Sequence, residues 1–526
     1  MEAVRIQTRQ KRILALCAHL HEDRAAKQDH EWLQPMAGLH VASLIDRRRY
    51  AVSLYHEMWS GPFDTASIRF GEYAIVFLTG LQMDFDRMRQ LAFFFRRAGT
   101  LVVGGGSICT LFPEFAGRFF DVVCAGGVEA VADVMRDYEA GSTKPLYRSA
   151  QHKIRSYEID FSVLNEARVA PPAHYLETSR GCNFSCDFCS LPAEGARHAT
   201  YALSEVERTI DNAIRSSPRF SLRRLYSMVW FIDNNFSNNL PHLRAVCGLL
   251  KRDKRVRMWG ALVTQDVLRN RELLKLMAES KCRGLFAGIE SLDPEFIASH
   301  HKRQNVSGAS SLLDDLAYAD SLGIMVTYGY LFDPRMTEIA QMERELRAIL
   351  NSDTLHHPFF LAFVAPLAGT KLFWEAVDQG ELLPNLRLRD LDGRVVAYRN
   401  TKDTPEALGQ FARNIFTNAE VYMRPGMRLR RFLQHLVRRG WRRPISNYLF
   451  LENRLRLTRL GRKHSKVART YMGGTDILDP QYRDCPNDIS PADRELYFTP
   501  IQVTDGQGAL ASWLVPYHPK SGKRVA

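Results

Sequence analysis

The sequence predicts an α/β protein built of an N-terminal doubly wound (Rossmann-like) domain, a partial (β/α)6 barrel and a mostly helical C-terminal extension. Two series of short, apolar, β-rich segments alternate with helical patterns, and this alternation indicates parallel sheets covered by helices. A polar stretch that ends in two prolines separates the series, and a basic, helical pattern follows the second. We therefore place the doubly wound domain at 1–150, a linker at 151–173, the barrel at 174–385 and the extension at 386–526.

The first series contains apolar segments of strand character that are separated by helical patterns. The strands are predicted at 12–20, 50–58, 72–80, 100–106 and 121–127. The helices are predicted at 35–48, 83–99 and 129–141. Strands and helices in this order form a doubly wound sheet, which binds its ligands at the carboxyl edge of the strands.

Small residues follow the third, fourth and fifth of these strands. Glycine lets the backbone approach a bulky or anionic group closely. Any one of these turns is explained as an ordinary strand-to-helix connection, but three at one sheet edge favour a binding site. The candidate residues are Thr79, Gly80, Gly104, Gly105, Gly106, Ser107, Gly126 and Gly127.

The second series repeats the pattern of a strand followed by a helix-compatible stretch. Its strands are predicted at 174–182, 226–233, 257–265, 284–291, 324–332 and 357–367. This number of units is typical of an incomplete parallel barrel, whose functional groups cluster at the carboxyl ends of the strands. A group of cysteines comes directly after the first strand.

The composition is that of a soluble globular protein, with 45% hydrophobic and 25% charged residues. No apolar run reaches the roughly 20 residues that are needed to span a bilayer, so we expect a cytoplasmic protein. Of the 9 cysteines, those outside the cluster are scattered singly, which is unlike a secreted disulfide framework.

The net charge of +13 is concentrated near the C-terminus. Between Arg424 and Arg469 there are 15 Lys and Arg residues and one acid, Glu452. These residues account for the whole excess of positive charge, so the basic surface belongs to the extension.

The segment 424–443 has the pattern of a basic amphipathic helix. Leu429, Phe432, Leu433 and Leu436 recur at a spacing of three or four residues, with arginines on the other face. Such a helix can contact an anionic membrane or a nucleic acid. It can equally pack its apolar face on the barrel and leave its charges in solvent. The membrane interpretation would make the protein peripheral on the inner membrane.

The cysteine cluster lies in SRGCNFSCDFCS (179–190), with the spacing C-x3-C-x2-C. A structural zinc site would need a fourth ligand, and His198 lacks a second cysteine pair beside it. A disulfide would leave an odd thiol in an unsuitable compartment. A four-iron cluster fits better, because three thiolates on one loop bind three irons and leave the fourth open.

The cluster and its place after the first barrel strand resemble the radical S-adenosylmethionine (SAM) enzymes. The resemblance implies that Cys182, Cys186 and Cys189 hold a [4Fe-4S] cluster whose open iron chelates the amino and carboxylate groups of SAM. One electron, from a donor such as flavodoxin or ferredoxin, would then cleave SAM to a 5'-deoxyadenosyl radical.

Other strand ends resemble the same family. WFIDNNF (230–236) is similar to an F-x-D-D-x-F stretch, with Asn234 in place of the second acid, and APLAGT (365–370) is similar to a P-x-P-G-T turn. Taken alone, each of these polar residues also fits a helix cap or a turn. The resemblance places five residues near SAM: Asp233, Asn235, Gln265, Glu290 and Tyr328.

The doubly wound domain ahead of the barrel resembles the cobalamin-binding subclass of that family, through 33–46, 102–114 and 122–131. The resemblance covers most of residues 10–385 and implies that the glycine-rich edge binds cobalamin. Two features of the sequence depart from the pattern of this subclass. The D-x-H-x-x-G sequence that supplies an axial histidine in many cobalamin proteins is absent, and Gly126-Gly127-Val128-Glu129 replaces the G-E-G-E acids. The alternative is a relic domain without cobalamin.

The subclass implies methylation of an unactivated carbon of a small molecule, natural product, tetrapyrrole or lipid. Three alternatives stay open: a cyclase or rearranging enzyme without methyl transfer, an RNA-modifying enzyme, and a non-catalytic iron–sulfur protein. Nucleic acid is disfavoured as a partner because the extra cluster cysteines and C-terminal β-barrel of related tRNA-modifying enzymes are not visible. A non-catalytic protein would not need polar residues at the barrel strand ends.

Overall fold

The fold is taken from a computed structural model of the chain. It describes residues 10–20, 35–150, 157–166, 173–219, 227–302, 311–356, 358–399, 402–417, 419–427 and 485–521, with the single positions 221, 224, 305, 429, 430 and 433.

The first sheet has 6 parallel strands in the order β2-β1-β3-β4-β5-β6. They are β1 (Lys11–Cys17), β2 (Tyr50–His56), β3 (Ile75–Thr79), β4 (Leu101–Gly104), β5 (Val122–Gly126) and β6 (Leu146–Ser149). The five predicted strands all form. The sixth, β6, was not predicted because its four residues, LYRS, contain no apolar run and pair only with β5 at the sheet edge.

Helices cover both faces of this sheet, as a doubly wound fold requires. Ile13 and Ala15 of β1 belong to the same core cluster as α1 and α6, whereas Leu14 and Leu16 pack with α3 and α5 on the other face. This alternation follows from the two-residue period of a strand. The helices of this unit are α1 (Met36–Ser43), α2 (Glu57–Ser60), α3 (Phe85–Arg97), α4 (Ser107–Leu111), α5 (Pro113–Ala116) and α6 (Ala130–Glu139).

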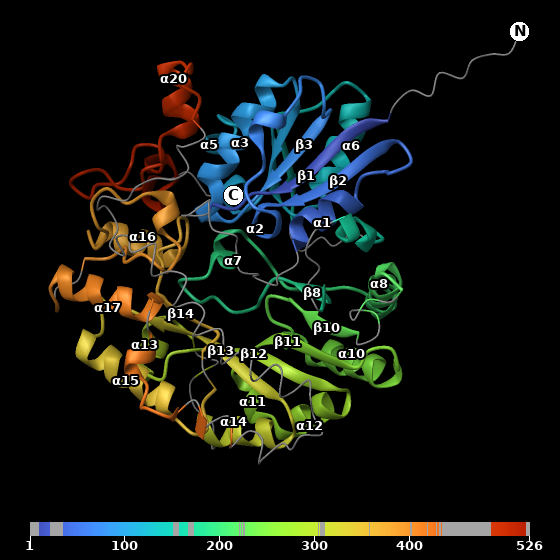
Figure 1. The fold of residues 1–526 in the computed structure, drawn as a ribbon. Coiled ribbons are helices and arrows are strands. Elements are labelled where there is room, and N and C mark those ends of the chain that lie inside the picture. Colours follow the sequence, from blue (N-terminus) through green and yellow to red (C-terminus); the bar gives the residue numbers. More distant parts are fainter. Residues whose placement is uncertain are drawn as a thin grey trace, which may run out of the picture.

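The second sheet also has 6 parallel strands, in the sequential order β14-β13-β12-β11-β10-β7. All six predicted strands are present: β7 (His174–Leu176), β10 (Met228–Phe231), β11 (Met258–Thr264), β12 (Cys282–Glu290), β13 (Met325–Phe332) and β14 (Phe360–Phe363). The sheet curls into an open half-barrel (Figure 1). The predicted α/β class, with a doubly wound sheet and a partial barrel, is confirmed.

Helices line the outside of the half-barrel and bury the outward side chains of its strands (Figure 1). Several begin at side-chain caps, since Asn239 accepts a hydrogen bond from the backbone N–H of His242 and Thr370 from that of Phe373. The helices are α8 (Leu203–Ser216), α10 (Leu240–Arg252), α11 (Asp266–Arg269), α12 (Arg271–Glu279), α13 (Pro294–Ser299), α14 (Leu312–Ser321), α15 (Ile339–Asn351) and α16 (Lys371–Asp378).

Segments outside the two sheets pack into the hydrophobic core that the two sheet units share. A short helix in the predicted linker, η3 (Phe161–Glu166), buries Phe161, Val163 and Leu164 in the core cluster that spans both units. Beyond the barrel, α17 (Pro405–Thr417) packs Phe411 into the same cluster. Most of the basic segment 424–443 lies outside the described residues.

The described C-terminal residues return to the first sheet unit. Tyr497 and Phe498, in the helical turn η9 (Arg494–Phe498) after α20 (Pro491–Asp493), pack against Phe93 of α3 at ring-centroid distances of 5.4 and 5.2 Å. The red C-terminal segment therefore lies beside the blue N-terminal unit in Figure 1. No described helix is long and apolar enough to cross a membrane.

Candidate functional site

The carboxyl edges of the two sheets face each other. Gln82, after β3, donates to the carbonyl of Ala368 at 3.0 Å and accepts from its N–H at 3.0 Å. Ser107, at the start of α4, donates to Glu194 at 2.5 Å. Both contacts join a loop at the edge of the first sheet to a loop at the edge of the second, so the predicted ligand-binding edges of the two units meet in one region.

The cysteine loop lies in this region, between β8 (Ser179–Arg180) and α7 (Ser190–Ala193) (Figure 1). Strand β8 pairs with β9 (Ala199–Thr200) in a short antiparallel ribbon that closes the loop at its base. Gly181 opens the loop with φ +77°, and a Cβ on it would stand 2.2 Å from the carbonyl oxygen of Arg197. Only glycine fits there.

The three thiols of the loop are partly exposed. Burial and the neighbouring Cys186 and Cys182 thiols raise the pKa of Cys189 to about 11. Among the described residues, no three His, Cys, Asp or Glu side chains converge on one point as they would around a single metal ion. The zinc interpretation with His198 therefore has no preformed ligand set within the described ranges.

Asp233 fixes the backbone that leads into the cysteine loop. Its carboxylate, 1% exposed at the end of β10, accepts hydrogen bonds from the backbone N–H of Thr178 (2.7 Å), the Thr178 hydroxyl (2.6 Å) and the Ser179 hydroxyl (2.6 Å). Burial raises the pKa of Asp233 to about 7 against the opposing effect of these donors. The next residue, Asn234, accepts from the N–H of Gly181 at 2.8 Å. These side chains act on the backbone that leads into the first cysteine.

Asn235 and Gln265 occupy the neighbouring strand ends. Asn235 is 2% exposed, accepts from the Ser237 hydroxyl at 2.6 Å and donates to Asn238 at 3.1 Å. Asn238 in turn accepts from the N–H of Asn183 at 3.4 Å. Gln265, at the end of β11, makes no side-chain hydrogen bond to another described residue. Of the two, Gln265 keeps its amide available for a ligand.

Glu290 ends β12 in a left-handed conformation with φ +64°. Its carboxylate pairs with the buried Lys302 ammonium at 2.5 Å, and Lys302 also donates to the carbonyl of Gly288 at 2.8 Å. Asn305 donates to the same carbonyl at 2.9 Å. The strand register shifts at this point, between Ala287 and Glu290. A strained backbone that is fixed by several contacts is typical of functional sites.

Tyr328 does not line this region, contrary to the expectation. Its side chain, 1% exposed, belongs to the core cluster beneath the outer helices and donates to the carbonyl of His356 at 3.0 Å. Tyr330, two residues on, donates to Glu345 of α15 at 2.7 Å. Both tyrosines therefore lie on the outward face of β13, because side chains two residues apart share a face.

The candidate residues of the first sheet lie together at its carboxyl edge, after the neighbouring strands β3, β4 and β5. Several glycines there are required by the protein's own packing: a Cβ on Gly106 would stand 2.6 Å from the Gly80 carbonyl, and one on Gly126 would stand 1.9 Å from the Ser149 carbonyl. Gly105 differs, since the nearest atom to its Cβ position is 3.9 Å away. Of Gly80, Gly104, Gly105, Gly106 and Gly126, Gly105 is thus the one with room for a ligand.

Arg180 forms a contact between the units that no sequence pattern predicted. Its guanidinium pairs with Glu129, at the start of α6, at 2.7 Å and with Glu177 at 3.0 Å. Nε2 of His40, in α1, lies 3.4 Å from the same oxygen of Glu177. Although burial opposes ionisation, His40 and Arg180 lower the pKa of Glu177 to about 2. Arg180, the residue before Gly181, is therefore held by carboxylates from both units.

The model of the "Radical SAM superfamily" matches residues 176–343 of the chain. The matched range begins at the end of β7 and includes the cysteine loop. The chain contains a radical SAM domain. This finding assigns the three-cysteine loop to the family in which the resemblance placed it.

Curated relatives of this chain are methyltransferases by name. A bacteriochlorophyllide d C-8(2)-methyltransferase from Chlorobaculum tepidum is 23% identical over 59% of this chain and 70% of its own length. A hopanoid C-2 methylase from Rhodopseudomonas palustris is 28% identical over 30% of this chain and 29% of its own length.

Solved structures share the fold of both units. The cobalamin-dependent SAM radical enzyme OxsB, with aqua-cobalamin bound, superposes with a TM-score of 0.57 at 13% identity, over 87% of this chain and 76% of that chain. The radical SAM methyltransferase TsrM from Kitasatospora setae, with tryptophan and a SAM analogue bound, gives a TM-score of 0.54 at 14% identity, over 79% and 90% of the two chains. The likeness extends beyond the radical SAM domain to the doubly wound unit ahead of it.

The donor set of the radical SAM loop fits an iron–sulfur cluster. Each thiolate of a four-iron cluster binds a different iron, so the three cysteines need not converge on one point. Thiols with a raised pKa lose their protons when they bind metal, as Cys189 would. The loop is also closed at its base and hydrogen-bonded on the side of β10, which suits a fixed ligand set.

Proposed function

We propose that the chain is a cobalamin-dependent radical SAM enzyme that transfers a methyl group to an unactivated carbon of a small molecule, natural product or lipid. One observation carries the proposal: the cysteine loop of the radical SAM domain faces the glycine-rich carboxyl edge of a doubly wound unit. Ligands of such sheets bind at that edge, so two cofactors held by the two units would meet there. The methyltransferase names of the curated relatives support it.

The residues that would hold the cofactors follow from their positions. Cys182, Cys186 and Cys189 would bind the cluster, Gln265 and Glu290 would contact SAM, and the edge around Gly105 would accommodate cobalamin. When bound, these groups supply the electron, the adenosyl radical and the methyl group that the reaction needs. The protein's contribution is to place them and to exclude water.

Three features of the chain itself would perform that placement. Asp233 and Asn234 fix the backbone ahead of the first cysteine through hydrogen bonds to Thr178 and Gly181. Lys302 fixes the direction of the Glu290 carboxylate. Gln82 and Ala368 keep the two sheet edges together through a pair of buried hydrogen bonds. A reactive centre needs such fixed geometry, because a small displacement slows the reaction strongly.

The interior of the half-barrel suits an apolar substrate. Phe360 of β14 is 40% exposed and stacks on Phe286 of β12 at a centroid distance of 6.0 Å. Trp230 of β10 lies over Gly260 and Gly284, where a Cβ would come within 2.1 and 2.9 Å of its ring. These side chains give the interior an aromatic wall. The named substrates of the relatives, a bacteriochlorophyllide and hopanoids, are also largely apolar molecules.

The proposal includes two partners. An electron donor such as flavodoxin or ferredoxin would reduce the cluster. The basic segment 424–443 would contact an anionic membrane, and its described residues Leu429 and Leu433 are 62% and 50% exposed, as the apolar face of such a helix would be. Peripheral attachment to the inner membrane would bring the enzyme to a lipid substrate.

Release of 5'-deoxyadenosine tests the proposed chemistry. We expect anaerobically reconstituted protein to release 5'-deoxyadenosine from SAM when a reductant is added, and Cys186→Ala to abolish the release. Cys485→Ala is the matched control, because Cys485 is also partly exposed but lies outside the loop. Product is measured by liquid chromatography and mass spectrometry.

The outcomes separate the alternatives. Wild-type protein that holds a cluster but releases no 5'-deoxyadenosine would contradict the radical reading and favour a non-catalytic iron–sulfur protein. Release of 5'-deoxyadenosine with substrate turnover but without S-adenosylhomocysteine would favour a cyclase or rearranging enzyme instead of a methyltransferase.

A further inference from the structure

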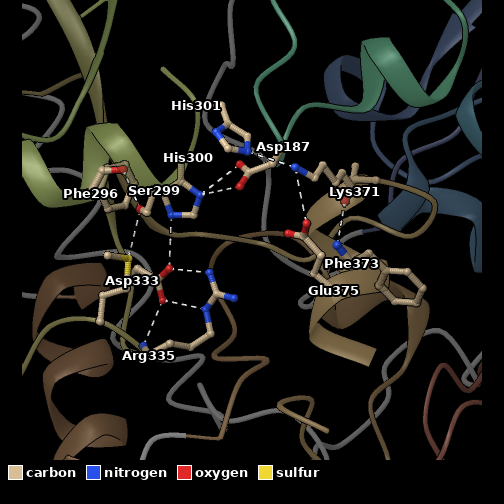
Figure 2. Close-up of polar contacts among 12 residues, drawn as sticks. Asp187, Phe296, Ser299, His300, His301, Asp333, Arg335, Lys371, Phe373 and Glu375 are labelled. Atoms are coloured by element: carbon tan, nitrogen blue, oxygen red, sulfur yellow. Dashed lines mark hydrogen bonds and ion pairs between the residues drawn. The ribbon is translucent and has the colours of Figure 1, made fainter. Parts of the chain in front are cut away.

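A buried chain of ionisable side chains leads from the cysteine loop to the loop that follows β13 (Figure 2). It begins at Asp187, the residue after Cys186, and continues through His300 and Asp333 to Arg335. Asp187, His300 and Asp333 are 5%, 1% and 1% exposed. Asp187 lies within the cysteine loop without being one of its cysteines, whereas His300, Asp333 and Arg335 belong to none of the sequence motifs described above.

His300 is the centre of this chain. It follows α13, where its N–H donates to the carbonyl of Phe296 at 3.2 Å. Nδ1 lies 3.0 and 3.2 Å from the two oxygens of Asp187, and Nε2 lies 3.3 Å from an oxygen of Asp333. A neutral imidazole donates through one nitrogen only, so two facing carboxylates select the doubly protonated, positive form. Although burial opposes it, hydrogen bonds to Asp187 and Asp333 raise the pKa of His300.

Asp333 is fixed in turn by Arg335. The guanidinium donates to both oxygens of Asp333, at 3.0 and 2.6 Å, and pairs with Glu381 at 3.0 Å. It also lies 4.4 Å over the ring of Tyr398. These contacts leave His300 little freedom to turn, because its second partner is held in a bidentate pair.

The other side of Asp187 is held by the backbone and by packing. The carbonyl of Asp187 accepts from the N–H of Leu372, at the start of α16, at 3.1 Å. The next residue, Phe188, packs its ring against His300 at 5.6 Å. The half of the loop that carries Cys186 and Cys189 is therefore fixed from α13, β13 and α16 together.

We propose that His300 is a positioning residue for the iron–sulfur site: as a buried cation it holds Asp187 and thereby fixes Cys186 and Cys189 for the cluster. This inference rests on the proposed function, because it requires that the loop binds the cluster. Partners one step removed from a metal ligand orient that ligand and tune the metal, and their loss costs about 10- to 100-fold in metal affinity. With the cluster bound, a positively charged His300 beside the loop would favour the reduced form.

Two variants test the proposal through iron retention and reduction potential. His300→Gln removes the charge and one of the two contacts; we expect iron to be lost to a chelator ~10- to 100-fold faster than from the wild type, and the midpoint potential to become more negative. Asp187→Asn removes a negative charge from the same contact. We expect it to accelerate iron loss as well, but to make the potential less negative.

The neighbouring His301 supplies the matched control. It is exposed and lies 3.0 Å from the Lys371 ammonium, outside the chain that runs to Asp333. We expect His301→Gln to keep the wild-type iron loss, potential and electron paramagnetic resonance spectrum. The opposite shifts in potential distinguish a charged positioning contact from a general loss of stability, which would change both variants in the same sense.

The outcomes are separable from those of the proposed function. A wild-type protein that assembles no cluster overturns the proposed function. If the wild type assembles a cluster but His300→Gln has the same iron loss and midpoint potential, only the proposed role of His300 is overturned. If His300→Gln does not fold, Asp187→Asn decides alone, and wild-type iron loss and potential in that variant would overturn the proposal.

Discussion

At the scale of single residues, Glu177 and Arg180 show how charge fixes the entry to the cysteine loop. Arg180 lies between Glu177 and Glu129, and Glu129 is 0% exposed. An ion pair in such a place stabilises only while both partners are present, because an unpaired buried charge is costly. The local role of Arg180 is therefore to connect the loop to the first sheet unit, and that of Glu177 is to keep Arg180 in place.

This role predicts a pH-dependent loss of stability in Glu177→Gln. The folded protein holds the pKa of Glu177 at about 2, against an ordinary value of 4.5. The carboxylate therefore stabilises the fold above pH 4.5, and the contribution disappears as pH falls toward 2. At pH 7 we expect the variant to lose about 2–3 kcal/mol in free energy of unfolding.

Urea unfolding at pH 7 and at pH 3.5 measures this effect. The difference between wild type and Glu177→Gln should be smaller at the lower pH. Glu205→Gln is the control, because Glu205 lines a small cavity together with Glu177, but among the described residues its ion pair is the longer one with Arg208, at 3.8 Å. A constant difference at both pH values would contradict the ionic role of Glu177.

At the scale of elements, the strands and the cysteine loop could be predicted from the sequence because their signals are local. Apolar runs such as IVFLT of β3 and the spacing of Cys182, Cys186 and Cys189 are visible within a few residues. The short strand β6 carried no such signal, and the orientation of Tyr328 depends on which face of β13 meets the outer helices. The contact of Gln82 with Ala368 joins residues 286 positions apart, so no local pattern contains it.

The edge glycines of the first sheet give a prediction at the same scale. Gly126 has φ +88° and leaves only 1.9 Å between its Cβ position and the Ser149 carbonyl, so Gly126→Ala should lose at least about 2 kcal/mol in free energy of unfolding. Gly105→Ala should keep the wild-type stability, because its Cβ position is open. Thermal unfolding of both variants measures the difference.

Cobalamin binding by Gly105→Ala gives the functional half of this prediction. If the open space beside Gly105 accommodates cobalamin, the added methyl group should weaken binding in a protein that is otherwise stable. Equal affinity in wild type and Gly105→Ala, measured by the visible absorbance of cobalamin, would place the ligand elsewhere on the edge.

At the scale of the whole molecule, the C-terminal segment packs against the first sheet unit. The C-terminal residues pack on α3, where Arg89 is 2% exposed and donates to the carbonyl of Thr499 at 2.8 Å. Removal of 485–526 would expose Phe93 and leave Arg89 without that acceptor. Loss of several buried aromatic contacts should lower the melting temperature by roughly 10 °C or more.

Calorimetry of the truncated chain checks this expectation. Val515→Ser serves as the control, because Val515 is 51% exposed and its change should leave the melting temperature as it is. An unchanged melting temperature after removal of 485–526 would show that the first sheet unit does not depend on the C-terminal segment.

The central claim is that the two sheet edges form one site for both cofactors. Its most direct test is the formation of S-adenosylhomocysteine by the anaerobically reconstituted protein with SAM, reductant and added cobalamin. We predict that S-adenosylhomocysteine forms only when cobalamin is present, and that the cobalamin spectrum changes on binding. An unchanged spectrum, with no S-adenosylhomocysteine or an equal amount without cobalamin, would contradict the claim.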